Sequence, residues 1–321
     1  MTKLIAYRLL HMIPVLLGIS FITFLIMQLA PGDFLSTLEL DPQISQESID
    51  AMRARFGLDQ HWTVQYVLWL KNIVFHLDFG TSFSRHQPVF SVLRTGFANT
   101  LLLGIAAATI TWVVAVPLGI VAAVKQYSWF DKSSSLVAFL GISVPEVFLA
   151  LLLILLAAWT GWFPIGGMRS LNFDTLSPMG KALDMAHHLA LPAVVLATVP
   201  LASRMRQMRG NLLDVLRADY VTTARAKGLP EGTVIVKHAV RNAINPLITL
   251  FGYTLATLLS GSLLVEVVMS WPGLGRITLE ALQTRDLYLM MGSVMLSSTM
   301  LILGNLIADI LLAISDPRIK V

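Results

Sequence analysis

The sequence predicts an all-α membrane protein with six transmembrane helices. Of its 321 residues, 55% are hydrophobic and only 13% are charged, whereas a soluble domain carries roughly 25% charged residues. Mean hydropathy is +0.72, and long uncharged stretches recur along the chain. These observations place most of the chain in lipid, where a helix satisfies its own backbone hydrogen bonds.

The composition excludes several kinds of chemistry. The chain has no cysteine, so it offers no disulfide, thiol nucleophile or thiolate metal site. Its pI of 9.4 would suit nucleic acid, but the positive charges are distributed as a membrane-topology signal, described below. We therefore expect no nucleic-acid partner.

Residues 9–30 form the predicted first span. These 22 residues carry no charge and follow Lys3 and Arg8, and they are long enough to cross a hydrocarbon core of about 30 Å. A cleaved signal peptide is the alternative, but it would have a shorter apolar core and a small-x-small cleavage site. Ala30-Pro31-Gly32 is a poor site, so residues 1–30 are interpreted as an uncleaved transmembrane segment.

Residues 31–96 are polar and mixed in charge, and they predict a small helical extracytoplasmic subdomain. Residues 46–56 and 63–73 show the spacing of short amphipathic helices. A disordered loop is the alternative. Aromatic residues argue against it, because disordered tracts contain few of them: Trp62, Tyr66, Trp69 and Phe79.

Residues 97–321 predict a core of five further transmembrane helices. Short charged or polar segments separate them, and Pro and Gly inside them are ordinary for membrane helices. The turn at 125–132, the polar loop at 161–185 and the long loop at 204–242 set their limits. The predicted spans are 97–124, 133–160, 189–203, 243–265 and 287–314.

Charge bias predicts the orientation. The two tails, the 125–132 turn and the 204–241 loop hold 14 of the 23 Lys and Arg but only 5 of the 19 Asp and Glu. Residues 31–96 instead hold 5 basic and 7 acidic residues. We expect both termini and the 204–241 loop to be cytoplasmic.

The loop at 211–242 predicts a helical hairpin parallel to the membrane surface. Residues 211–227 form its first helix, with Leu213, Leu216, Tyr220 and Ala224 on one apolar face. Gly228 suits the position after its end, and a second helix covers 231–242. Small residues at 224, 226 and 228 would let another surface approach closely. Spacing alone leaves protein docking and binding to anionic lipid equally open.

The hairpin resembles the coupling loop of ABC-importer permeases, whose common pattern is Glu-Ala-Ala-x-x-x-Gly. Thr222-Thr223 departs from the first two positions, but Asp219-Tyr220 and the run from Thr223 to Gly228 are similar to the dipeptide/oligopeptide/nickel branch. The long segment after the first span resembles the B-type member of the permease pair. Other motifs of that branch occur in order: Pro31-Gly32-Asp33, Phe79-Gly80-Thr81-Ser82, His238-Ala239-Val240-Arg241-Asn242-Ala243, Ser270-Trp271-Pro272-Gly273-Leu274-Gly275-Arg276 and Asp316-Pro317-Arg318.

The resemblance implies a type I ABC importer fold in a bacterial-type plasma (inner) membrane. Its implied partners are a second homologous permease, two ABC ATPase subunits and an extracytoplasmic solute-binding protein. Peptides, glutathione and nickel chelates all remain possible substrates. The implied ATPase-coupling residues are Leu216, Asp219, Tyr220, Thr223, Ala224, Arg225, Ala226, Lys227 and Gly228.

No G-x-x-x-x-G-K-[ST] phosphate loop is present, and Gly180-Lys181 is only a fragment of one. We therefore expect this chain to bind no cofactor and to be no enzyme, with ATP and Mg acting on partner ATPases.

Two sets of residues are candidates for the transport route itself. Glu146 lies within the predicted 133–160 span beside Pro145. Intramembrane carboxylates usually face a cavity or a partner, so these two residues are candidates for the translocation pathway, with a helix-packing carboxylate as the alternative. Glu266, Trp271, Pro272 and Gly273 lie in the loop after the fifth span, which the resemblance implies to be an outer gate.

Other polar residues in the spans favour structural roles. Adjacent helical residues point about 100° apart, so His187 and His188 do not easily share a metal, and we predict no metal site. His11 and Asp309 are interpreted as packing or hydrogen-bonding residues.

Two competing functions were considered. A membrane-embedded enzyme is disfavoured because H-E-x-x-H, a G-x-S-x-G elbow and paired intramembrane aspartates are all absent. A stand-alone secondary transporter would have no need of a docking hairpin.

Overall fold

The computed structural model describes residues 2–39, 45–55, 57–248, 250–251 and 262–315. These residues are helical with connecting turns, and among them no strand forms beyond a single bridge between Thr81 and Pro88. The prediction of an all-α protein is therefore confirmed. The chain divides into two compact units, one of residues 1–5, 101–271 and 301–321 and the other of residues 6–100 and 272–300.

Four helical segments in the described part of the chain are long and apolar enough to cross a membrane, and a bent pair could supply a fifth. The single segments are Ile5–Ser36, Val89–Val124, Pro178–Leu216 and Leu287–Ile310. Six spans were predicted. Residues 249 and 252–261 of the predicted span at 243–265 lie outside the described residues, so the structure supports a multi-pass helical protein without the full count.

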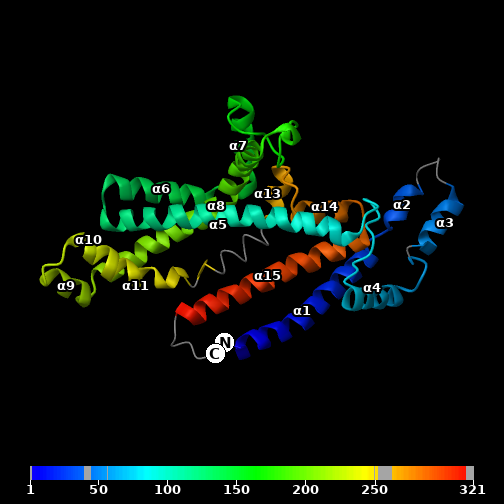
Figure 1. Ribbon diagram of the computed structural model, residues 1–321, viewed down its shortest axis with the longest axis horizontal. Coiled ribbons are helices and arrows are strands. Elements are labelled where there is room, and N and C mark those ends of the chain that lie inside the picture. The colour runs from blue at the N-terminus through cyan, green and yellow to red at the C-terminus, as the bar shows by residue number, and fades with distance from the viewer. Residues whose placement is uncertain (1, 40–44, 56, 249, 252–261, 316–321) are drawn as a thin grey trace. The chain divides into compact units, whose positions relative to one another are not determined.

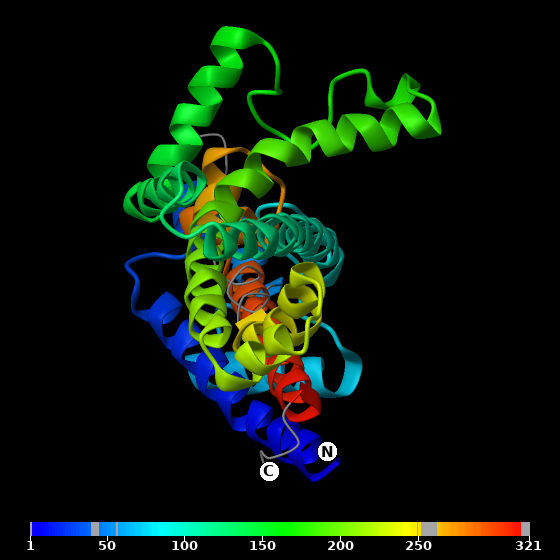
Figure 2. The ribbon, with the colours of Figure 1, turned by 90° about the vertical axis from the view of Figure 1, so that its left-hand side faces the viewer.

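The span predicted at 133–160 is a pair of helices with a sharp bend between them. Helix α6 covers Trp129–Ser143 and α7 covers Glu146–Thr160, and the two are bent by 106° (Figure 2). Val144 is extended, with φ −83° and ψ 122°, because a following proline disfavours helical backbone at the preceding residue. Pro145 also lacks the amide that would continue the helix.

Helix α8, Pro178–Leu216, replaces the predicted loop end and the predicted span at 189–203. It starts earlier because Ser177 caps its first turn, accepting from the Gly180 amide at 3.2 Å, and because proline suits the first helical position. Pro192 and Pro200 lie inside it. The helix changes direction along its length (Figure 2), as expected where proline removes a hydrogen bond.

Small side chains let α6 and α8 pack closely with α5, Val89–Val124. Ala115, Ala122, Ala138 and Ala202 form one buried cluster with Met205. A Cβ on Gly119 would lie 2.7 Å from the Met205 carbonyl oxygen, so no larger residue fits there without movement. Close backbone approach through small residues is the usual way that membrane helices associate.

A buried ion pair joins the start of α6 to α8. Asp131 is 2% exposed; its Oδ1 accepts from Arg209 Nε at 2.5 Å and its Oδ2 from Arg209 Nη2 at 2.7 Å. Oδ2 also accepts from the Tyr127 amide at 2.9 Å. This bidentate contact fixes residues 125–128 against α8. They are the part of the predicted 125–132 turn that is not helical, since α6 already begins at Trp129.

The second unit contains the segment predicted as a small helical subdomain. Its main helices are α2 (Phe34–Leu38), α3 (Gln46–Arg55) and α4 (Trp62–His76), and α3 and α4 match the two helices predicted there. Trp69 is buried against Phe24 of α1 (Thr2–Leu29) and Leu287 of α15 (Leu287–Ser315). This packing excludes a disordered loop over the described part of the segment.

Residues 79–88 are fastened to the end of α14, Leu274–Gln283, and to α15. Asp286 is fully buried; its Oδ2 accepts from Ser82 Oγ at 2.6 Å and from the amide and hydroxyl of Ser84, both at 3.0 Å. Arg85 pairs with Glu280 through Nε at 2.9 Å and Nη2 at 2.5 Å. The hydrogen bond from Arg85 lowers the pKa of Glu280, despite partial burial.

We predict that Asp131→Asn destabilises the protein by about 3 kcal/mol, because it removes one partner of a buried pair. Thermal unfolding of the purified protein in detergent measures the effect. Lys132→Gln removes a charge from the exposed neighbouring residue and should change little. The double replacement Asp131→Leu with Arg209→Met should recover most of the loss, because it leaves no charge unpaired. An unchanged melting temperature in Asp131→Asn would contradict this role.

Candidate coupling site

The predicted helix at 211–227 is broken in the structure. Helix α8 ends at Leu216, Ala218 is extended with ψ 146°, and a separate helix α9 covers Asp219–Ala226 (Figure 1). Asp219 lies in the first turn of α9, where its negative charge favours the helix dipole. The break turns α9 away from the line of α8.

The far end of α9 follows the prediction. Gly228 has φ +74°, a left-handed conformation that glycine adopts without steric cost. The second helical stretch consists of α10 (Glu231–Thr233), the π-helix η2 (Val234–Val240) and α11 (Arg241–Ala243). A helix at 231–242 was predicted; its π-helical middle was not.

The break also changes which side of α9 is buried. Val221 is fully buried and Ala224 is 6% exposed, whereas Tyr220 is 44% exposed. The predicted apolar face grouped Tyr220 with Ala224, but the extended Ala218 interrupts the helix and the two side chains differ in burial. The Tyr220 hydroxyl instead accepts a hydrogen bond from Asn242 Nδ2 at 3.0 Å.

Val221 and Ala224 close a hydrophobic cluster at the base of the hairpin. They pack with Val234 and Ala239 of the second stretch and with residues of α5 and α8. The other fully or nearly buried members are Ala123, Met208, Leu212, Ala243 and Leu247, and Leu216 packs against them partly buried. The hairpin is thus a continuation of the helix core.

The opposite side of α9 faces away from this cluster. Ala224, predicted to allow close approach by a partner, does not lie on this side. Ala226 and Gly228 do, and neither carries a bulky side chain. The exposed residues here are Asp219, Tyr220, Thr222, Thr223, Arg225, Ala226, Lys227 and Gly228, and this set is called the α9 outer face below.

Arg225 braces the hairpin from the α9 outer face. Its Nη2 donates to Glu231 Oε1 at 2.8 Å, and its Nε lies 3.2 Å from both carboxylate oxygens. The hydrogen bond from Arg225 lowers the pKa of the exposed Glu231 carboxylate. The contact closes the loop over Gly228, so α9 is held at both ends.

Two models of one transport family together match most of this chain. The binding-protein-dependent transport system inner membrane component matches residues 115–321, and the N-terminal model of the same membrane component matches residues 1–104. The chain belongs to this family. It is the permease component of a binding-protein-dependent transport system and a multi-pass inner-membrane protein.

Curated relatives of this permease match over its full length. The oligopeptide transport system permease protein AppB of Bacillus subtilis (strain 168) is 41% identical, with 100% of both chains covered. The dipeptide transport system permease protein DppB of Escherichia coli (strain K12) is 37% identical, covering 100% of this chain and 99% of that one.

A solved structure supports the fold. An inward-facing form of the MetNI methionine ABC transporter has a TM-score of 0.51 and 17% identity, and covers 69% of this chain and 97% of the compared chain. At this identity the likeness concerns the fold alone, which is that of an ABC importer membrane subunit.

The pathway and gate candidates of the permease lie at breaks between helices. Pro145 caps α7 without a side-chain bond, and Glu146 is the first residue of α7 and half-buried. Glu146, predicted to lie mid-span, therefore lies at the bend between α6 and α7. Glu266 in α13, Leu263–Val268, is fully buried; it accepts from Ser262 Oγ at 2.7 Å, and its carbonyl accepts from the Trp271 amide at 2.8 Å.

The remaining gate residues fix the chain before α14. Asn99 Nδ2 donates to the Pro272 carbonyl at 2.8 Å. The amide of Leu274, which follows Gly273, donates to Thr100 Oγ1 at 2.7 Å. Trp271 is fully buried. Trp271 is therefore anchored to α13, whereas Pro272 and the residue after Gly273 are anchored to α5.

The adjacent histidines are bonded to backbone carbonyls. His187 Nε2 lies 2.7 Å from the Trp162 oxygen, and His188 Nδ1 lies 2.8 Å from the Asp184 oxygen. Over the described residues, no group of three His, Asp or Glu side chains could hold a metal. His11 is exposed, and its ring lies 4.2 Å from that of Tyr7. Asp309 is half-buried in α15.

Sequence reasoning missed the partners that hold these elements. Glu231 follows Arg225 by six residues and was not recognised as its partner. Asp131 and Arg209 are 78 residues apart, and no spacing rule links them. Acidic residues do lie near the basic loops, but sequence position alone did not show which acidic residue pairs with which basic one.

We predict that Ala224→Leu destabilises the protein by about 1–3 kcal/mol, because it overpacks a full cluster. Ala226→Leu makes the same change two residues away on the α9 outer face and should leave the melting temperature within experimental error. Thermal unfolding in detergent compares the two. Equal melting temperatures for both variants would show that the buried side of α9 is assigned wrongly.

Proposed function

We propose that this chain is one transmembrane subunit of an ATP-driven importer of peptides or similar small solutes. The names of the full-length relatives support the substrate class. The chain would form half of the translocation pathway and pair with a second homologous permease. A solute-binding protein would deliver substrate from the extracytoplasmic side, where the charge bias places residues 31–96.

The observation that carries the proposal is the α9 outer face. It combines exposed small and polar residues with a fully packed underside, which suits a surface that another protein grips. We assign it to docking on one of two ABC ATPase subunits, on which ATP and Mg would act. The charge bias puts this surface and both termini in the cytoplasm.

The packing supplies a route for motion. Because Val221 and Ala224 share one cluster with Met208 of α8 and Ala123 of α5, a displacement of α9 moves the ends of two long helices with it. Such a rigid-body shift is a common form of switching in transporters. Lipid binding alone would not need this connection.

Pro145 and Glu146 are assigned to the translocation pathway. The 106° bend between α6 and α7 interrupts a helix beside a carboxylate, and interrupted helices often line transporter sites. Glu266, Trp271, Pro272 and Gly273 are assigned to the outer gate, where Glu266 and Trp271 are held by the α13 contacts.

We predict that Ala226→Leu uncouples transport. In proteoliposomes holding the complete importer and peptide, uptake should fall at least tenfold while basal ATP hydrolysis persists, because the added bulk displaces the ATPase from α9. Ala158→Leu makes the same change at an exposed position of α7 and should transport normally. Normal uptake by Ala226→Leu would contradict the docking assignment.

Two outcomes of the same assay bear on other functions. Uptake by this chain without ATPase subunits would favour a secondary transporter. Cleavage of peptide by this chain alone would favour a membrane enzyme.

We also predict that Glu146→Gln lowers uptake of peptides with a free amino terminus several-fold, because a pathway carboxylate would attract the ammonium group. N-acetylated peptides of the same sequence should be affected less. Competition between the two peptides in proteoliposomes measures the difference. An unchanged preference would mean that Glu146 serves helix packing.

A further inference from the structure

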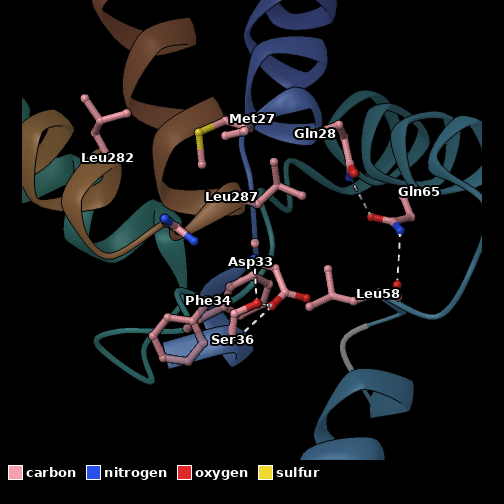
Figure 3. Close-up of a pocket in the computed structure, with 13 residues that line it drawn as sticks. Met27, Gln28, Asp33, Phe34, Ser36, Leu58, Gln65, Leu282 and Leu287 are labelled. Atoms are coloured by element: carbon pink, nitrogen blue, oxygen red, sulfur yellow. Dashed lines mark hydrogen bonds between the residues drawn. The ribbon is translucent and has the colours of Figure 1, made fainter. Parts of the chain in front are cut away.

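A cavity of about 420 Å³ lies within the unit of residues 6–100 and 272–300, apart from the α9 outer face. The end of α1, α2, α4 and the α14–α15 connection surround it (Figure 3). Apolar side chains line much of the wall, among them Met27, Phe34, Leu58 and Leu287. Its volume is in the range of small-ligand pockets.

Arg285 supplies the cavity with a cation held in an uncommon backbone conformation. It follows α14 and its C-cap Thr284, and its φ is +54°. Glycine is the usual residue at such a position after a helix, because an L-residue there is strained. Backbone geometry alone would therefore favour glycine, so the side chain at this position needs a separate explanation.

The guanidinium of Arg285 lies against the backbone of Gly32. Gly32 has φ +81°, and a Cβ there would collide with Arg285 Nη1. The missing side chain at Gly32 makes room for the arginine. Two left-handed residues on different helix ends thus combine to place one cation in the cavity wall.

The nearby acidic residue is already in use. Asp33 Oδ1 accepts from the Ser36 amide at 2.8 Å and from Ser36 Oγ at 2.7 Å. Its Oδ2 lies 3.4 Å from Arg53 Nη2, which also pairs with Glu39 at 3.1 Å. Among the described residues, no carboxylate pairs with Arg285. The cavity therefore offers an anion site.

The cavity wall also carries two side-chain amides, Gln28 and Gln65. Gln28 Nε2 donates to Gln65 Oε1 at 3.3 Å, and Gln65 Nε2 lies 3.5 Å from the Leu58 carbonyl oxygen (Figure 3). Gln65 Nε2 also donates to the Gln60 carbonyl at 2.8 Å. This arrangement leaves the Gln28 carbonyl oxygen as an acceptor. A ligand with one carboxylate, one amide donor and an apolar side chain would match these groups.

We propose that this cavity binds the carboxyl end of a short peptide, with Arg285 holding the carboxylate and Gln28 accepting from the last peptide amide. Arginine is suited to a carboxylate because its planar donors form two parallel bonds. The choice of a peptide rests on the proposed function. The site is a substrate subsite on the permease, separate from Glu146.

Peptide binding to the full-length chain alone tests the proposal. The chain is held in maltoside micelles, which contain no phosphate or carboxylate, and titrated with alanyl-phenylalanine by calorimetry or saturation-transfer NMR. Arg285→Gln should weaken binding at least tenfold, the usual effect of losing a charge-assisted hydrogen bond. The same peptide with a C-terminal amide should bind the natural chain as weakly.

Two further variants separate binding from folding. Arg285→Gly suits the left-handed backbone, so it should fold at least as well by thermal unfolding and yet fail to bind. Arg276→Gln removes an exposed charge from α14 outside the cavity and should bind as the natural chain does. If Arg285→Gly binds normally, Arg285 is not the anion receptor.

Other outcomes overturn the peptide assignment. They are no binding to the natural chain, equal binding of the acid and amide peptides, or displacement by inorganic phosphate at equal concentration, which would indicate a general anion site. This assay needs no ATPase and measures no uptake. Failure here with uncoupling by Ala226→Leu intact would reject the subsite and keep the importer function.

Discussion

The burial of Val221 and Ala224 under α9 is the contact on which the candidate site depends. A helix of 8 residues is too short to be stable alone in water, so α9 exists because its underside completes a cluster with α5, α8 and η2. The same contact makes the exposed side available to a partner. Arg225 and Glu231 then close the hairpin at its tip.

Polar contacts near the ends of the long helices play a second part. The Asp131–Arg209 and Asp286–Ser82 contacts join segments that are 78 and 204 residues apart. The first buries an aspartate with its arginine, and the second gives a buried aspartate three donors from one loop. Helix packing through alanine and glycine brings the backbones close, and these pairs set which turns face each other.

The sequence predicted the all-helical membrane class because composition and uncharged stretches report directly on lipid. It also predicted Gly228 as the residue that ends the helix, because glycine readily adopts the left-handed conformation and Pro230 prevents the helix from continuing. It did not predict the phase of α9, because one extended residue, Ala218, shifts every later side chain. The bend at Val144 had a visible proline, but proline is also common in unbroken membrane helices.

The candidate site was predictable only as a segment. The motif from Thr223 to Gly228 located it, whereas the buried and exposed sides followed from tertiary packing. Arg285 was not recognised for a similar reason: its importance comes from a glycine 253 positions earlier in the chain. Neither residue type nor sequence spacing predicts a contact between residues so far apart in the chain.

The length of α8 has a mechanical consequence. Its 39 residues give a contour of about 58 Å at 1.5 Å per residue, nearly twice the roughly 30 Å thickness of a hydrocarbon core. The helix must therefore extend well beyond the lipid at one end or both. Because α9 follows the last turn of α8, a partner bound to α9 would apply force outside the membrane to the end of a helix that crosses it.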